Sequence, residues 1–392
     1  MSESNRGTDR LVEVFMEGMA GVTPDVPPSF EELEAAALEA MDERAYDYVA
    51  GGAGGERTVD HNRDAFARWH LWPRVLRDFA ERDLSTELLG TELSVPVLLA
   101  PIGVQSIVHE EGELGTARAA AVQDVPIVVS SAASHTMETV ADELGGTPGW
   151  FQLYWSSNDD VAKSFVRRAE AAGYEALVVT VDNNALGWRE RDVAGGYLPF
   201  LDGEGVANYF ADEAFRDLLD EPPEEAELQA IRTFVEIFGD PSLTFDDLEW
   251  LCEFAEIPVV VKGVLHPADA QKAVERGADG VVVSNHGGRQ VDNAVPALEA
   301  LPKVVSAVPD GVPVVFDSGV RRGADAIVAL ALGADAVALG RPYAYGLAVD
   351  GGDGVEAVLE NFLADLDLTL GLVGYDDVDT VDRGAVVRAD EL

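Results

Sequence analysis

The sequence predicts an α/β protein folded as a (β/α)8 barrel, and three observations carry that prediction. Eight short apolar runs recur along the 392 residues, and each is followed by a segment with helical spacing. Within a run the apolar residues are continuous rather than alternating, which is typical of parallel strands buried on both faces. Polar residues stand where the runs end, at the edge where a barrel carries its chemistry. A doubly wound open sheet is the alternative.

The predicted strands are spread over the middle and the end of the chain. In order they are 95–101, 125–131, 150–154, 176–182, 257–263, 280–285, 312–318 and 336–340. Segments 158–173, 266–278 and 322–334 have the spacing, the polar starts and the glycine ends of helices. We expect a single domain over 1–392 with its barrel core at about 95–345.

Two further regions complete the predicted architecture. In the N-terminal helical segment, 1–90, Ser29 and Glu32 form a capping box that opens one helix through residues 31–50, ending at Gly51 and Gly52. About 75 residues separate the fourth and fifth strands, which is longer than an ordinary loop. The part at about 190–250 is interpreted as a lid, and the alternative is a solvated acidic insertion.

Charge excludes several classes of partner. The chain has 72 acidic and 27 basic residues, a net charge of −45, so nucleic acid and anionic membranes are not expected partners. A hydrophobic content of 47% indicates a folded core rather than a disordered acidic chain. Only four of the basic residues are lysines, and this composition suggests adaptation to high salt, a halophilic habitat.

The cysteine count and the hydropathy pattern limit the possible disulfides, metal sites and cellular location. Cys252 is the only cysteine, so an intramolecular disulfide and a cysteine-based zinc cluster are excluded; we expect Cys252 to be buried and no metal to be bound. The chain has no signal-peptide pattern and no run of 18 apolar residues, which predicts a soluble, cytoplasmic protein.

Histidine stands at one of the predicted strand ends, in the stretch SNHGGRQ (284–290). His286 follows a strand directly, and the two glycines after it let the backbone turn so that Arg289 also faces the barrel mouth. A neutral imidazole can accept a proton during turnover, and Asp182, at the end of the fourth strand, could orient the ring. Arg289 and Arg189 supply planar forks suited to a carboxylate. The pattern indicates an anionic substrate that loses a proton.

The other strand ends are polar as well. They carry Gly103, Ser130, Gln152 with Tyr154, Thr180 with Asp182, Lys262, Ser284, Asp317, and Gly340 with Arg341. Single residues of these types are ordinary in turns, but so many converging on one rim favour a functional site.

With these residues in view, the chain resembles the FMN-dependent α-hydroxy acid oxidising enzymes, the family of glycolate oxidase and lactate oxidase. The resemblance runs from YDYVAGGAGGE (46–56) through SNHGGRQ to GRPYAYGLA (340–348). It implies that His286 is the general base, that Arg189 and Arg289 bind the substrate carboxylate, and that Tyr48 and Tyr154 contact the carboxylate and the hydroxyl. It also implies homotetramers.

The same resemblance implies FMN as the cofactor, held by many of the strand-end residues. Lys262 matches the lysine at the N1 edge of the flavin, where negative charge gathers on reduction. Asp317 matches a ribityl contact. The phosphate is expected near DSGVRRG (317–323), a place where barrels commonly bind phosphate. The expected cofactor-binding residues are Pro101, Gly103, Ser130, Gln152, Thr180, Lys262, Ser284, Asp317, Gly319, Arg321, Gly340 and Arg341.

Gly103, together with the segments LGWRERD, YLPFL, GEGVANYF and GRPYAYGLA, resembles the lactate 2-monooxygenase branch of the family. We interpret the glycine as extra room beside the flavin, and a packing role is the alternative. Ala132 and Ala133 stand where several oxidases carry a bulky aromatic, which allows substrates larger than lactate. The expected reaction is oxidation of an L-2-hydroxy acid, with lactate as substrate and oxygen as acceptor. A quinone-linked dehydrogenase, a type 2 isopentenyl diphosphate isomerase and a flavin-retaining binding protein without turnover are the alternatives.

Overall fold

Eight parallel strands close into one barrel, joined in the order in which they occur along the chain. The computed structural model describes residues 5–392. The barrel strands are β4 (Val97–Leu99), β5 (Ile127–Ser130), β6 (Gly149–Tyr154), β7 (Ala176–Thr180), β8 (Val259–Val264), β9 (Gly280–Val283), β10 (Val314–Phe316) and β11 (Ala336–Leu339). The closed sheet confirms the predicted barrel and excludes the open sheet.

Helices follow the strands around the outside. They are α5 (Gly112–Gln123), α6 (Met137–Leu144), α7 (Asp159–Ala171), α12 (Phe245–Phe254), α13 (Pro267–Glu275), α14 (Ala297–Val305), α15 (Gly323–Ala331) and α16 (Arg341–Val373). Helices α7, α13 and α15 fall within the three segments predicted from spacing. Helix α16 is broken at Asp350 and Gly351, whose backbone angles are not helical.

The barrel interior explains where the site lies. Inward-facing apolar side chains form a core of their own, which includes Val128, Trp150, Val178, Val260 and Val282. Successive side chains of a strand point to opposite faces, so the residue two positions later faces inward again. Those next inward positions are Ser130, Gln152, Thr180, Lys262 and Ser284. The inward face is therefore apolar below and polar at the C-terminal ends of the strands.

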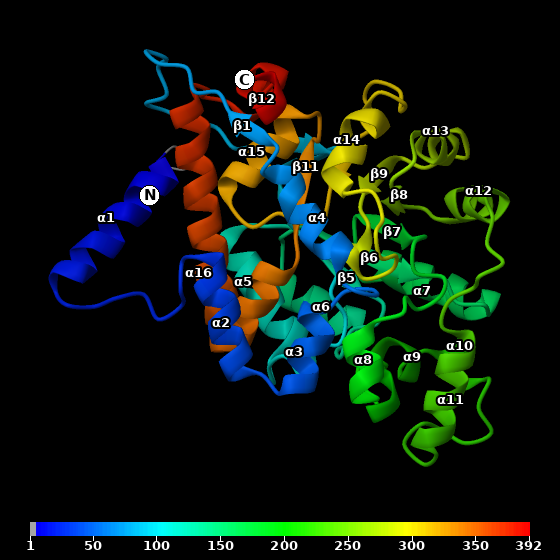
Figure 1. Ribbon diagram of the computed structural model, residues 1–392. Coiled ribbons are helices and arrows are strands. Elements are labelled where there is room, and N and C mark those ends of the chain that lie inside the picture. Colours follow the sequence, from blue (N-terminus) through cyan, green and yellow to red (C-terminus); the bar gives the residue numbers. More distant parts are fainter. Residues whose placement is uncertain (1–4) are drawn as a thin grey trace.

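A hairpin of β2 (Thr86–Leu88) and β3 (Thr91–Leu93) adds Leu88 and Leu93 to this interior core. A second small sheet pairs β1 (Trp69–Leu71) with β12 (Val386–Arg388), and the turns η5 (Val378–Thr380), η6 (Arg383–Ala385) and η7 (Ala389–Glu391) surround the C-terminus. Figure 1 shows β1, β12 and the C-terminus at one end of the molecule, and α3, α8 and α11 at the other.

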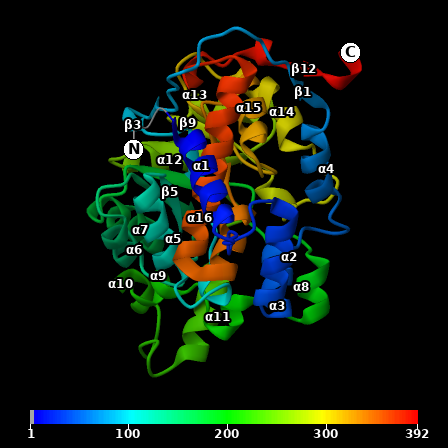
Figure 2. The ribbon, with the colours of Figure 1, turned by 90° about the vertical axis from the view of Figure 1, so that its left-hand side faces the viewer.

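The N-terminal segment is helical but differs from the prediction in one respect. It contains α1 (Arg6–Met19), α2 (Phe30–Ala40), α3 (Glu43–Ala50) and α4 (Arg57–Phe66). The single helix expected over 31–50 is two helices, because Met41 is extended and the Asp42 side chain caps α3 at the Arg44 amide. The Ser29 side chain caps α2 at Glu32, as predicted. Figure 2 shows α1 crossing over α16.

The long connection after β7 is folded. It contains α8 (Glu190–Gly195), η3 (Pro199–Asp202), α9 (Ala207–Phe210), α10 (Glu213–Arg216) and α11 (Glu227–Ile237) before α12. The aromatic rings of Phe200, Tyr209, Phe215 and Phe234 are buried in it. The connection therefore has an apolar core of its own, while its acidic residues Glu221, Glu224 and Glu225 are exposed.

Two further expectations meet the structure here. Cys252, expected to be buried, is only half-buried in α12, and its partial burial raises the pKa of the thiol to about 12. Over residues 5–392, no helix has both the length and the apolar character needed to cross a membrane.

Candidate active site

His286 stands on a short turn, η4 (His286–Gly288), which two residues separate from the end of β9. Both His286 and Gly287 have positive φ, 58° and 62°, so the turn is strained at the histidine. A Cβ on Gly288 would lie 2.8 Å from the Val59 nitrogen, so only glycine lets the turn pack against α4. The turn holds the imidazole at the barrel mouth.

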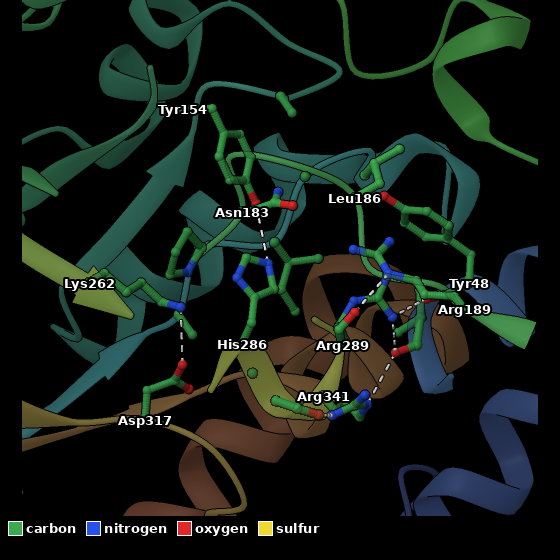
Figure 3. A pocket seen from close by; sticks show the side chains of 18 of the residues that line it. Tyr48, Tyr154, Asn183, Leu186, Arg189, Lys262, His286, Arg289, Asp317 and Arg341 are labelled. Atoms are coloured by element: carbon green, nitrogen blue, oxygen red, sulfur yellow. Dashed lines mark hydrogen bonds and ion pairs between the residues drawn. The ribbon is translucent and has the colours of Figure 1, made fainter. Parts of the chain in front are cut away.

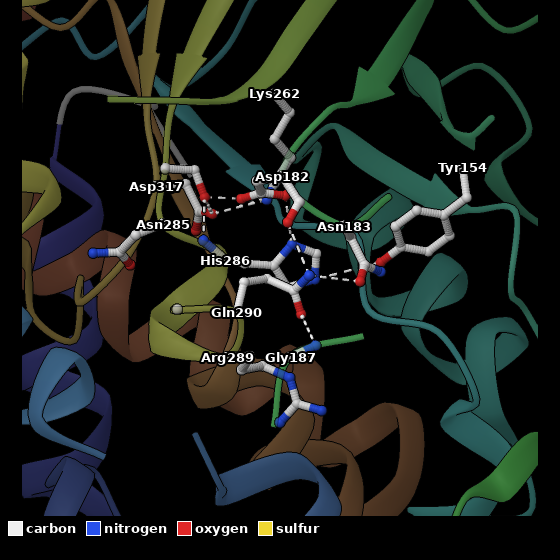
Figure 4. A network of polar contacts seen from close by, with 12 residues as sticks. Tyr154, Asp182, Asn183, Gly187, Lys262, Asn285, His286, Arg289, Gln290 and Asp317 are labelled. Carbon is white, nitrogen blue, oxygen red and sulfur yellow. Dashed lines mark hydrogen bonds and ion pairs between the residues drawn. The ribbon is translucent and has the colours of Figure 1, made fainter. Parts of the chain in front are cut away.

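The ring is fixed by two neighbours (Figure 4). Its Nδ1 lies 2.9 Å from Asp182 Oδ1, and its Nε2 lies 3.4 Å from the Tyr154 hydroxyl oxygen. Burial lowers the pKa of His286 and outweighs the opposing effect of Asp182. Burial alone would raise the pKa of Asp182, but the adjacent imidazole holds that pKa below its usual range. A charged Asp182 thus accepts a hydrogen bond from Nδ1–H, and Nε2 keeps its lone pair.

Asp182 reaches this position because a glycine leaves space for it. Gly263 in β8 has φ of 108°, and a Cβ there would lie 2.6 Å from the Asp182 carboxyl carbon. Any larger residue would push the carboxylate away from the imidazole.

Arg189 and Arg289 face the same cavity with a surplus of positive charge. Their guanidinium carbons lie 5.7 Å and 4.9 Å from the centre of the Tyr48 ring. The nearest carboxylate to Arg189 is that of Asp192, at 3.8 Å. Burial and the charge of Arg189 lower the pKa of Arg289, which means that the site lacks compensating negative charge. An anionic ligand would supply it.

Lys262 is the buried cation on the opposite side. Its Nζ lies 3.1 Å from Ser284 Oγ and 3.2 Å from Asp317 Oδ2, and Ser284 Oγ donates to Asp317 at 2.5 Å. Burial lowers the pKa of Lys262, but the charges of Asp317 and Asp182 more than reverse this effect, so the pKa is raised and the lysine stays charged.

Buried polar atoms without a hydrogen-bond partner lie beside Lys262 in the polar layer. Gln152 Nε2 and Thr180 Oγ1 are two of them, although Ser130 Oγ fixes the Gln152 amide by donating to its Oε1 at 3.0 Å. Unpaired buried donors are rare and costly, so this layer is suited to a polar ligand. A flat ring system with heteroatoms along its edges, such as a flavin, fits these donors.

A cavity open to solvent connects the arginines, the histidine and the lysine (Figure 3). Of the predicted site residues, it brings together Tyr48, Pro101, Gly103, Tyr154, Arg189, Lys262, His286, Arg289, Asp317, Gly340 and Arg341. Its lining does not include Asp182, Ser130, Gln152, Thr180, Ser284, Gly319 and Arg321.

Two predicted phosphate ligands have other contacts. The Arg341 guanidinium donates to the carbonyls of Val49, Gly51 and Gly287 at 3.0–3.1 Å. The Arg321 guanidinium lies 4.4 Å from the centre of the Phe30 ring, although its Nε has no partner. Burial and the charge of Arg341 lower the pKa of Arg321, so an anion between them would be stabilised.

Gly103 has a packing role, which was the alternative to extra room beside the flavin. A Cβ on Gly103 would lie 2.7 Å from the Ala132 carbonyl oxygen. The glycine lets the loops after β4 and β5 approach each other, and this accounts for it without any spare room.

Several site residues were missed by sequence reasoning. Ile102, Leu186, Phe200 and Phe238 form an apolar part of the cavity wall, and Asn183 lines it as well. Gln290, the last residue of SNHGGRQ, bonds the loop that carries Arg189. The position of Asn183 directly after Asp182 at a strand end was a usable signal, whereas the apolar wall comes from loops.

Fold and site together define a barrel enzyme with a hydrogen-bonded aspartate and histidine opposite two arginines whose charge is not neutralised. The model of the family described as FMN-dependent dehydrogenase matches residues 37–388. This chain therefore belongs to that family of oxidoreductases, and its cofactor is FMN.

Relatives agree with this assignment. An L-lactate oxidase of Lysinibacillus sphaericus (strain C3-41) is 42% identical over 366 residues, which span 93% of this chain and 94% of that protein. An L-lactate oxidase of Nostoc sp. (strain PCC 7120) is 41% identical, over 91% of this chain and 97% of its own. A crystal structure of mandelate oxidase with (S)-4-hydroxymandelic acid has a TM-score of 0.82 and 37% identity, and the match covers 92% of this chain and 98% of that one.

Proposed function

We propose that this protein oxidises an L-2-hydroxy acid to the 2-keto acid and passes the electrons to oxygen, with lactate as a substrate. The observation that carries the proposal is a neutral imidazole, held by Asp182, that faces two buried guanidinium groups without a matching anion. A carboxylate on the arginines would bring the α-carbon and its hydroxyl to the His286 side of the cavity. The L-lactate oxidases related to this chain agree with that substrate class.

FMN, when bound, accepts the two electrons that leave the substrate. For its ring we assign the polar layer of Ser130, Gln152 and Thr180 with Lys262 at the N1 edge, and Pro101, Gly103 and Ser284 around them. We assign Asp317 to the ribityl chain, and Gly319, Arg321, Gly340 and Arg341 to the phosphate. Two observations support this assignment. Gln152, Thr180 and Arg321 each have a buried polar atom without a hydrogen-bond partner, and the charge of Arg341 lowers the pKa of Arg321.

Different residues of the cavity bind the substrate carboxylate, accept the substrate proton and bond the substrate hydroxyl. Arg189 and Arg289 bind the carboxylate, and Tyr48, stacked beside both, completes that clamp. His286 Nε2 accepts the substrate proton, and Asp182 stabilises the imidazolium that forms. The Tyr154 hydroxyl, whose pKa burial raises, stays protonated and bonds the substrate hydroxyl.

Substrate side chains would lie against the apolar wall. Ile102, Ala132, Leu186, Phe200 and Phe238 line that part of the cavity. Because Ala132 contributes only a methyl group, we propose that side chains larger than that of lactate are accepted.

Visible absorbance tests the proposal. Purified protein in concentrated KCl should show a flavin band that L-lactate bleaches under anaerobic conditions. His286→Ala should keep FMN and lose bleaching, whereas a binding protein without turnover would bind FMN and never bleach. A wild-type band unchanged by lactate and by bulkier L-2-hydroxy acids would refute the function.

Analysis of the products formed from L-lactate in air distinguishes an oxidase from a monooxygenase. Pyruvate with hydrogen peroxide identifies an oxidase, and acetate identifies a monooxygenase. The close approach of Ala132 accounts for Gly103 by packing, so the glycine no longer supports a monooxygenase, although the segment LGWRERD still resembles that branch. We also propose a homotetramer, which light scattering would test; the support is the exposed apolar side of α1, where Phe15 and Met19 are 67% and 83% exposed.

A further inference from the structure

Gln290 has only one possible amide orientation. Its Nε2 lies 2.8 Å and 3.0 Å from the carbonyl oxygens of Asp182 and Ala185, and its Oε1 lies 3.2 Å from Arg189 Nη2. Backbone carbonyls only accept hydrogen bonds and guanidinium nitrogens only donate them. The nitrogen of Gln290 must therefore face the carbonyls and its oxygen the arginine.

This orientation fixes the neighbouring carboxamide. Gln290 Nε2 also lies 2.7 Å from Asn183 Oδ1. Since that nitrogen only donates, the atom of Asn183 that faces it must be the oxygen. Asn183 Nδ2 therefore points the other way. The Asn183 side chain is buried, with 7% of the residue exposed, so it has little freedom to turn.

Nδ2 is then the atom of Asn183 that is free to face the Tyr154 hydroxyl. Figures 3 and 4, from two directions, both place the Asn183 carboxamide beside that hydroxyl, and Asn183 lowers the pKa of Tyr154 against the larger effect of burial. A phenol oxygen that accepts a hydrogen bond from this amide keeps its one proton for another partner. On its other side lies His286 Nε2, 3.4 Å away.

We propose that Asn183 is a positioning residue that sets the direction of the Tyr154 proton. Hydrogen bonds then run one way, from Gln290 to Asn183, to Tyr154, to His286 and on to Asp182. The Tyr154 hydroxyl is thereby held as a donor toward the space where the substrate hydroxyl must lie. The substrate hydroxyl can then accept the Tyr154 proton while it donates its own proton to His286. This inference rests on the proposed function and extends it.

Asn183→Asp reverses one link of the chain at nearly constant shape. One carboxylate oxygen keeps the bond from Gln290, but the other can only accept, so the Tyr154 proton turns toward residue 183. Anaerobic flavin reduction by L-lactate should slow roughly 10- to 100-fold, because a hydrogen bond that supports the reacting groups is lost. Binding should change less, since Arg189 and Arg289 are intact.

A matched control removes the effect of the added charge. Asn184→Asp places the same charge on the adjacent residue, whose side chain does not line the cavity. It should slow reduction less than threefold. Combined with Tyr154→Phe, Asn183→Asp should add no more slowing than Asn184→Asp does, because the group through which it acts is gone.

Titration of His286 by NMR in histidine-labelled holoenzyme gives a readout independent of turnover. Asn183→Asp should raise the pKa of His286 more than Asn184→Asp, because Nε2 loses its donor as well as gaining a nearby charge. Equal rates and equal titration in the two variants, or independent effects of Asn183→Asp and Tyr154→Phe, would overturn the inference. A wild type that no hydroxy acid reduces would instead refute the proposed function.

Discussion

Asp182 becomes the ion-pair partner of His286 when the imidazole takes up the substrate proton, and a large effect on the proposed reaction is expected from its loss. Asp182→Asn removes the charge that stabilises the imidazolium while it preserves the shape of the side chain. At the observed separation of 2.9 Å, two unit charges interact by about 6 kcal/mol with an effective dielectric constant of about 20. An amide oxygen keeps part of the hydrogen bond, so we expect a loss of about 3 to 5 kcal/mol, or roughly 10²- to 10⁴-fold in the rate of flavin reduction.

Anaerobic stopped-flow absorbance with saturating L-lactate measures that rate directly. FMN content and thermal unfolding of the variant should stay close to those of wild type. Asp335→Asn, which removes an aspartate from the opposite end of the barrel, serves as the matched control and should reduce flavin normally. Reduction by Asp182→Asn within threefold of wild type, with FMN bound, would refute the role given to this pair.

Three further outcomes are expected. Since the pKa of His286 lies below its ordinary 6.5 and the neutral ring is active, kcat/KM should rise with pH and level off, with a midpoint below 6.5; a midpoint above 6.5 would contradict the assignment. Asp367→Asn leaves the guanidinium of Arg82, which is 5% exposed and bonded to Asp367 at 2.7 Å, without its counter-ion. The free energy of unfolding, measured with urea, should fall by about 3–5 kcal/mol, and a fall below 1 kcal/mol would contradict a stabilising role of this ion pair. If the net charge of −45 reflects a halophilic habitat, the unfolding temperature should rise as KCl increases from about 0.1 M to 1 M. Over this range the Debye length falls from about 10 Å to 3 Å, which screens the repulsion between the acidic residues. An unfolding temperature that does not change with KCl would contradict the halophilic interpretation.

The sequence pattern predicted the barrel because parallel strands buried on both faces read as continuous apolar runs, and eight such runs are each followed by a helical segment. It also singled out Lys262 and His286, since strand ends converge in a closed parallel sheet. It could not predict that Gln290 and Asn183 are bonded, because two loops bring them together and only the surrounding carbonyls decide which way each amide points. Nor could it show that Gly103 serves a close approach, which depends on the path of the neighbouring loop.

The alternation along each barrel strand also constrains how this protein can change. Lys262 follows Val260 by two residues on the same inward face, a rise of roughly 7 Å. A register slip of one residue would turn the whole polar layer outward and bury charge among the surrounding helices. Insertions and deletions within the barrel strands should therefore abolish activity. Substitutions among the apolar residues that lie deeper in the barrel than the polar layer should be tolerated. The boundary between the apolar floor of the barrel and its polar rim is a single pleat.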